Sequence, residues 1–234
     1  MFTRELRVMP SDASLTGRIK LFNLLNYFQD TAELAVEKIE GSSVELYSRG
    51  YAWILSKYEI DFHADLPTIT QKFSVSTFHD PHHGYNTLRM FHLHSDDGSK
   101  ILSAKTSWLL VDVRSGRPVK PLAHIPGIDS GDCGDIDPSF SEIPDVTETL
   151  HTENITVRYH DTDYNGHVNN AIYFRWLCDY SGNESNFRRI CASFRSGAKL
   201  GENITLRFGE GLCAVIREGN AKPCAKFLTE AMTN

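Results

Sequence analysis

A short polar run holds the densest group of chemically active side chains in the sequence: Arg158-Tyr-His-Asp-Thr-Asp-Tyr-Asn-Gly-His-Val-Asn-Asn170. Within it, Asp163, Asn165 and His167 occupy alternate positions, so in an extended segment their side chains project to the same side. We expect a helix to begin at about residue 167, which leaves free backbone N–H groups at 166–168 beside them. Such donors at the positive end of a helix suit a developing oxyanion. The run is therefore a candidate catalytic site.

A purely structural role is the alternative, because Asp and Asn are favoured at helix N-caps and either Asp161 or Asn165 could cap this helix. An internal repeat weighs against that interpretation. The run Asp12-Ala-Ser-Leu-Thr-Gly17 aligns without gaps with Asp161-Thr-Asp-Tyr-Asn-Gly166, and the same alignment places Asp30 opposite Asp179.

In this alignment the first half carries neutral or basic residues at the three candidate positions, namely Ser14, Thr16 and Arg18. Serine and threonine can also cap a helix or close a turn. The structure alone therefore does not require an acid, an amide and an imidazole in the second half, and the difference favours a functional site there.

The elements that must position these residues follow from hydrophobic periodicity. In the first half, a strand is expected at about 3–9 and a long helix over 19–39, where apolar residues recur every three or four positions and Gly41 provides a stop. Residues 51–112 alternate apolar and polar side chains and contain turn residues, which predicts around four strands.

The second half repeats this order, with a strand at about 153–159, a helix from about 167 to 182 and shorter strands after it. Between the halves, residues 116–150 are rich in proline and glycine and are predicted to form a linker. We therefore predict two domains, 1–115 and 151–234.

One long helix wrapped by an antiparallel sheet, present twice, describes an α+β tandem, or double, hot-dog fold. In this interpretation the two sheets pair into one continuous sheet, so that each half covers the other's edge strand.

The composition narrows the function further. The 234 residues include 41% apolar and 23% charged residues, which is typical of a globular protein, and no apolar run is long enough to span a bilayer. The polar N-terminus is unlike a signal peptide, so a cytoplasmic location is expected. The net charge of −6 argues against nucleic-acid binding. The five cysteines form no CxxC pair, and the histidines near residues 79–94 lack a standard ligand spacing, so neither a metal nor a cofactor is expected.

The run Asp161-Thr-Asp-Tyr-Asn-Gly-His-Val-Asn-Asn-Ala-Ile-Tyr173 resembles the signature of the acyl-ACP thioesterases, plant-type and bacterial. The first half resembles the same family through four segments. These are Thr16-Gly-Arg-Ile19, Leu24-Leu-Asn-Tyr-Phe-Gln-Asp30, Gly50-Tyr-Ala-Trp-Ile-Leu55 and Ser107-Trp-Leu-Leu-Val-Asp112.

The resemblance implies a double hot-dog fold and hydrolysis of an acyl thioester on the phosphopantetheine arm of acyl carrier protein. It also implies that Asp163, Asn165 and His167 are catalytic. A further family glutamate follows the helix in an aromatic-x-x-Glu stretch. Here the matching stretch is Phe194-Arg-Ser-Gly197, so Gly197 stands at the expected glutamate position, and its neighbour Ala198 stands where some plant-type members carry a cysteine.

Our mechanistic hypothesis assigns Asp163 as general base on water or as direct nucleophile. Asn165 and the helix-start amides hold the carbonyl oxygen, while His167 orients Asp163 or water and can protonate the departing thiolate. An acidic carrier protein requires a local basic patch, for which five residues are candidates: Arg188, Arg189, Arg195, Lys199 and Arg207.

Three alternatives stay open. The first two are an acyl-CoA thioesterase and a dehydratase or hydratase, both of the same fold. The third is a non-catalytic acyl-binding protein, which Gly197 motivates. A monomer suits a chain whose halves pair with each other, and a homodimer is also compatible with the sequence.

Overall fold

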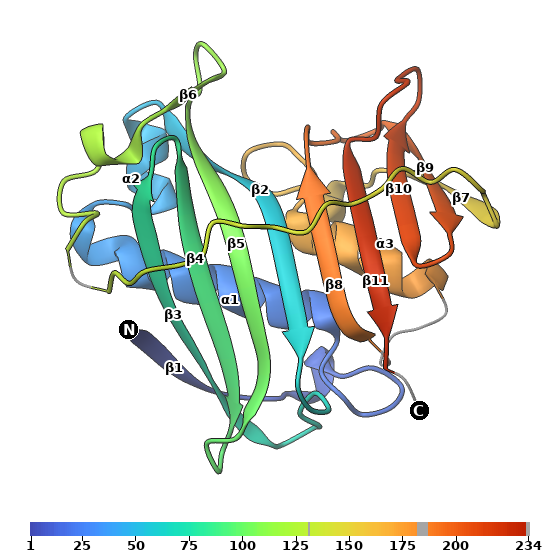
Figure 1. Ribbon diagram of the computed structural model, residues 1–234, viewed down its shortest axis with the longest axis horizontal. Coiled ribbons are helices and arrows are strands. Elements are labelled where there is room, and N and C mark those ends of the chain that lie inside the picture. Colours follow the sequence, from blue (N-terminus) through green and yellow to red (C-terminus); the bar gives the residue numbers. More distant parts are fainter. Residues whose placement is uncertain (131, 182–186, 233–234) are drawn as a thin grey trace. The chain divides into compact units, whose positions relative to one another are not determined.

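The computed structural model describes residues 1–130, 132–181 and 187–232, and its chain separates into two compact units, Met1–Phe140 and Ser141–Asn234 (Figure 1). The division falls inside the stretch 116–150 that we expected to be a linker. Each unit contains a helix packed on an antiparallel sheet. Among the described residues, no helix has the length and apolar character that a membrane span requires.

The strands described in the first unit are β1 (Phe2–Arg7), β2 (Tyr51–Phe62), β3 (Lys72–His83), β4 (Asn86–Ser95), β5 (Lys100–Asp112) and β6 (Arg117–Val119). Its helical elements are η1 (Pro10–Asp12), α1 (Leu21–Val36), η2 (Glu37–Ile39), α2 (Ser43–Ser48) and η3 (Pro121–Ala123). All strand pairs are antiparallel, in the order β1-β3-β4-β5-β2, with β6 pairing β5. The predicted long helix and the four strands that follow it are confirmed.

Helix α1 crosses one face of this sheet and buries its apolar stripe there (Figure 1). Phe28 of α1 stacks on Phe91 of β4, with ring centroids 4.9 Å apart. The predicted linker stretch also contributes to this unit, because Ile125 and Ile128 pack with Leu46 and Leu110 in a buried cluster.

The second unit contains β7 (His151–Thr156), η4 (Tyr159–Asp161), α3 (Asn170–Ser181), β8 (Phe187–Phe194), β9 (Asn203–Gly209), β10 (Leu212–Arg217) and β11 (Ala225–Ala231). Its sheet is antiparallel in the order β8-β11-β10-β9-β7. The repeat of strand, helix and strands is therefore confirmed. Tyr173 and Phe174 of α3 pack edge-on against Phe194 and Phe227 and anchor the helix on the sheet.

The prediction of two long helices is wrong for the second unit. Helix α3 has 12 residues, whereas α1 has 16, and α3 begins at Asn170 rather than near residue 167. The start is set by Asn169, whose Oδ1 accepts a hydrogen bond from the Ala171 N–H at 2.8 Å. Asparagine at this position supplies an acceptor to an otherwise unpaired amide, and it is the residue that caps the helix.

Candidate functional site

The three candidate residues lie on a tight hairpin between η4 and α3. The Asp163 N–H donates to the His167 carbonyl at 2.8 Å, and the Gly166 N–H donates back to the Asp163 carbonyl at 3.0 Å. Thr162 and Val168 form the bridge at its base. Gly166 has φ +74°, a left-handed conformation that glycine adopts without strain. The expectation of an extended segment at 163–167 is therefore wrong, because the chain reverses direction at this glycine.

The Asp163 carboxylate is partly committed to this turn. Its Oδ1 accepts hydrogen bonds from the Asn165 N–H at 2.9 Å and from the His167 N–H at 3.4 Å. Within the part of the chain that the structure describes, Oδ2 has no hydrogen-bond partner. One oxygen therefore fixes the orientation of the carboxylate, and the other is left to act on a substrate or a water.

The backbone amides that we expected to stabilise an oxyanion are occupied. Gly166 and His167 donate to Asp163 within the hairpin, and Val168 donates to the Ala198 carbonyl at 2.8 Å. The oxyanion prediction for the amides at 166–168 is therefore wrong, because the turn and the neighbouring loop take these donors before the helix begins.

Asp161 and Asn165 do not cap the helix either. Asp161 is only 4% exposed, and its carboxylate pairs with the Arg175 guanidinium of α3 at 2.6 Å. It also accepts the Arg158 N–H at 2.9 Å, and its carbonyl accepts the Asn169 N–H at 2.9 Å. Asp161 therefore ties the base of the hairpin to the helix and to the preceding turn.

The side-chain amide of Asn165 has a buried oxygen. Among the described residues this Oδ1 has no hydrogen-bond partner, although a buried carbonyl oxygen normally has a donor. An orphaned acceptor beside a half-buried carboxylate marks a place for a donor such as a water or a substrate N–H.

The His167 imidazole lies directly against Gly197. A Cβ atom built on Gly197 would be 2.8 Å from each of the His167 atoms Cβ, Cγ and Cδ2. Ordinary carbon contacts are about 3.5–4.0 Å, so any side chain at 197 would displace the ring. The position where the family resemblance implies a glutamate is therefore filled by the imidazole.

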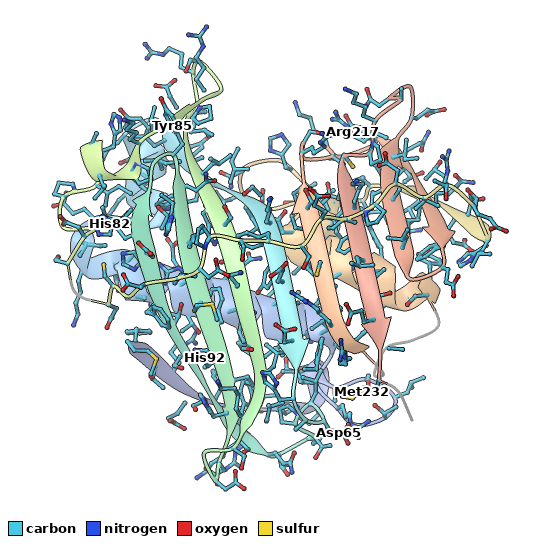
Figure 2. The ribbon with its side chains drawn as sticks, in the orientation of Figure 1. Asp65, His82, Tyr85, His92, Arg217 and Met232 are labelled. Carbon is cyan, nitrogen blue, oxygen red and sulfur yellow. The ribbon has the colours of Figure 1, made fainter. Side chains whose placement is uncertain are left out.

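The segment that carries Gly197 is held in place by three hydrogen bonds. The Ala198 carbonyl accepts from Val168, the Ala198 N–H donates to the Tyr173 hydroxyl at 3.0 Å, and the Gly197 carbonyl accepts from Arg217 at 3.2 Å. Arg217 is labelled in Figure 2. Sequence reasoning identified Gly197 but missed the roles of Tyr173 and Arg217. Tyr173 ends the motif run, but nothing in the sequence shows that its hydroxyl meets residue 198, and Arg217 is distant from the run in sequence.

The first unit builds the same hairpin from different side chains. Ser14 N–H donates to the Arg18 carbonyl at 2.8 Å, Gly17 N–H donates to the Ser14 carbonyl at 3.0 Å, and Ser14 Oγ accepts the Thr16 N–H at 3.3 Å. A hydroxyl thus closes this turn as well as a carboxylate does. The fold does not require the acid, the amide and the imidazole that the second unit carries.

No group of three or more metal-binding side chains occurs among the described residues. Four of the five cysteines are buried, Cys191 among them, and Cys133 is half-buried.

Comparison with known proteins agrees with this architecture. The chain superimposes on an acyl-ACP thioesterase from Bacteroides thetaiotaomicron with a TM-score of 0.82 and 23% identity, covering 97% of both chains. It matches a 12:0-ACP thioesterase from Umbellularia californica with the same TM-score and 16% identity, covering 100% of this chain and 97% of that one. The fold is therefore the α+β hot-dog-like fold of thioesterases.

Sequence comparison specifies the family. The Acyl-ACP thioesterase N-terminal domain matches residues 1–125, and the Acyl-ACP thioesterase C-terminal domain matches residues 145–205. A chloroplastic palmitoyl-acyl carrier protein thioesterase of Cuphea hookeriana is 27% identical over 202 residues, covering 76% of this chain. The match covers 46% of that protein, so the chain spans about half its length. The chain belongs to the acyl-ACP thioesterase family.

Proposed function

We propose that this protein hydrolyses the thioester of fatty acyl-ACP and releases a free fatty acid and the thiol of the phosphopantetheine arm. Family membership supports the reaction class. The observation that carries the assignment to these residues is the difference between the two hairpins. Both units close the same turn, but only the second places Asp163, Asn165 and His167 there.

Asp163 is the proposed base. Because its Oδ1 is held by two backbone N–H groups, Oδ2 faces the reacting water and accepts its proton as the water oxygen attacks the thioester carbon. In the alternative course Oδ2 attacks the carbon directly, the C–S bond breaks, and water then hydrolyses the mixed anhydride. Both courses consume one water and produce one acid and one thiol.

Asn165 is the proposed oxyanion donor, because the backbone amides at 166–168 already donate hydrogen bonds within the protein. A side-chain amide offers one acceptor and two donors. The orphaned Oδ1 would accept a hydrogen bond from the attacking water, and Nδ2 would donate to the thioester carbonyl oxygen as it becomes negative. The water is then held between Asn165 and Asp163.

His167 is the proposed acid for the departing sulfur. Protonation of the thiolate by the imidazolium completes the cleavage, and the ring later recovers its proton from the product acid or from water. The contact with Gly197 limits the orientations of the ring.

Thiol release from a panel of acyl-ACPs and the matching acyl-CoAs tests the proposal. We expect wild-type protein to favour acyl-ACP and Asp163→Asn to lose turnover by about 10³-fold or more, because the amide keeps a turn-closing oxygen but cannot act as a base. Ser14→Ala is the matched control, since it removes the equivalent turn contact in the first unit, and it should retain turnover.

The same panel separates the rival functions. Equal or faster release from acyl-CoA would assign the protein to acyl-CoA hydrolysis instead. Tight acyl-ACP binding without thiol release would favour a non-catalytic acyl-binding protein, the alternative suggested by Gly197 at the expected glutamate position.

A further inference from the structure

Three large, mostly apolar side chains stand exposed around the candidate hairpin. Tyr159 is 73% exposed, Tyr164 is 68% exposed and Leu200 is 57% exposed. Backbone hydrogen bonds hold their segments together, because Val168 donates to Ala198 at 2.8 Å and Gly201 donates to the Val157 carbonyl at 3.0 Å. Grouped exposed apolar side chains are a feature of binding surfaces.

Basic residues lie in the same segments. Arg158 precedes Tyr159, and Arg195 and Lys199 stand on either side of Gly197; all three are exposed. In the described part of the chain, none of the three forms an ion pair. The other basic candidates from the sequence lie elsewhere. Arg188 is near the opposite end of β8 and pairs with Glu230 at 2.6 Å.

The internal repeat shows which of these features the fold itself requires. In the first unit, the Ile19 N–H donates to the Pro67 carbonyl at 2.9 Å, which is equivalent to the bond from Val168 to Ala198 in the second unit. The Thr70 N–H donates to the Val8 carbonyl at 2.9 Å, which is equivalent to the bond from Gly201 to Val157. These bonds align the loop 64–71 with the loop 195–202.

The equivalent positions can therefore be compared directly. The apolar positions match, because Leu15 and Ile69 stand opposite Tyr164 and Leu200 and are 107% and 39% exposed. The basic positions do not match. The residues opposite Arg158, Arg195 and Lys199 are Met9, Ala64 and Thr68. The exposed apolar positions occur in both units, whereas the charges of Arg158, Arg195 and Lys199 have no counterpart at the equivalent positions of the first unit.

We propose that Arg158, Arg195 and Lys199, around Tyr159, Tyr164 and Leu200, form the docking surface for an acidic carrier protein that presents its phosphopantetheine-linked chain to Asp163. This inference rests on the proposed function. The protein carries a net charge of −6, so at long range it repels an acidic partner. A local basic rim around an apolar centre overcomes this repulsion in one orientation, which directs the pantetheine arm to the hairpin.

The test compares two substrates with the same acyl chain, one on carrier protein and one as the N-acetylcysteamine thioester, which has neither carrier nor phosphate. The variant replaces Arg158, Arg195 and Lys199 with glutamine together. We expect kcat/KM for the carrier substrate to fall by about 10- to 100-fold, mainly through KM, because each exposed charge pair contributes modestly. Turnover of the small thioester should stay within about twofold, since no proposed catalytic group changes.

Two further readouts sharpen the result. The wild-type reaction with carrier substrate should slow as salt concentration rises, and the triple variant should lose most of this dependence, because salt screens exposed charges. Arg207→Gln is the matched control: it removes an exposed cation from the middle of β9 and should leave both substrates unchanged.

If the triple variant loses kcat/KM equally on both substrates, or loses none on either, the proposed docking surface is wrong. If the wild-type protein hydrolyses neither substrate, the proposed function fails, and the docking surface is then tested by binding. For that purpose the carrier protein bears a non-hydrolysable acyl amide. Binding that the triple substitution weakens by about 10-fold or more supports the surface, and unchanged binding contradicts it.

Discussion

Replacing Gly197 with alanine perturbs the candidate site at one atom. The new Cβ would lie 2.8 Å from three atoms of the His167 side chain, including its own Cβ, so the overlap cannot be relieved by a small shift of the ring edge. The loop is held by Tyr173 and Arg217, at 3.0 Å and 3.2 Å. We therefore expect the imidazole to leave its position while the loop stays.

The size of the effect follows from this displacement. Overpacking of this kind costs about 1–3 kcal/mol of stability. A catalytic group displaced by about 1 Å can lose about 10²-fold in rate, so we predict a kcat at least that much lower for Gly197→Ala with little change in KM. Gly197→Glu should be worse, not better, because the larger side chain needs the same space.

The assay combines urea unfolding, steady-state kinetics and the imidazole resonances of His167 in NMR spectra. Gly134→Ala is the matched control, because its Cβ would meet the Phe78 ring at 2.9 Å in the first unit. It should lower stability by a similar amount and leave kcat unchanged. Unaltered His167 resonances in Gly197→Ala would refute the steric argument, and displaced resonances with full kcat would refute the role of His167.

Two other predictions concern the fold. Burial, reinforced by the nearby Arg89 cation, lowers the pKa of His79 to about 4, so the folded state favours the neutral imidazole. The contribution of His79 to the free energy of unfolding is therefore complete above the unfolded pKa of about 6.5. It is lost progressively as the pH falls towards 4. Between pH 7.5 and pH 5 the free energy of unfolding should fall by about 2 kcal/mol for this reason. Urea titrations at both pH values should show this loss in the wild-type protein and not in His79→Gln. Equal pH dependence in the two proteins would contradict the prediction. Thr70 has φ +71°, and the equivalent residue of the repeat, Gly201, has φ +81°. Both backbones are left-handed, a conformation that favours glycine, so Thr70→Gly should stabilise the protein by about 1 kcal/mol. Gly201→Thr should destabilise it by at least as much, and urea unfolding measures both changes. Changes of the same sign in the two variants would show that backbone conformation does not decide stability at this position.

Much of the architecture was predictable from periodicity. The apolar repeat over 19–39 and the alternation over 51–112 are strong signals because each extends over several turns or strands. The repeated order of elements was visible for the same reason.

The local structure of the candidate site was harder to predict. Alternate polar residues at 163, 165 and 167 fit an extended segment and a turn equally well. The dipeptide Asn165-Gly166 is a turn signal that favours the hairpin over the extended segment that we expected.

The reason for a glycine at 197 could not be predicted at all. Its backbone does not need glycine, because its φ is outside the left-handed region; the requirement comes from the contact with His167. That contact joins a loop to a hairpin that is distant in sequence. A single sequence contains no signal for the distance between two such atoms.

The central claim is that the hairpin acid performs thioester hydrolysis. Its most direct test is thiol release from one acyl-ACP by wild-type protein, Asp163→Asn and Ser14→Ala, each checked for intact folding by its urea midpoint. The account predicts turnover by wild type and by Ser14→Ala, and a loss of about 10³-fold or more in Asp163→Asn. Full turnover by a folded Asp163→Asn protein would contradict it.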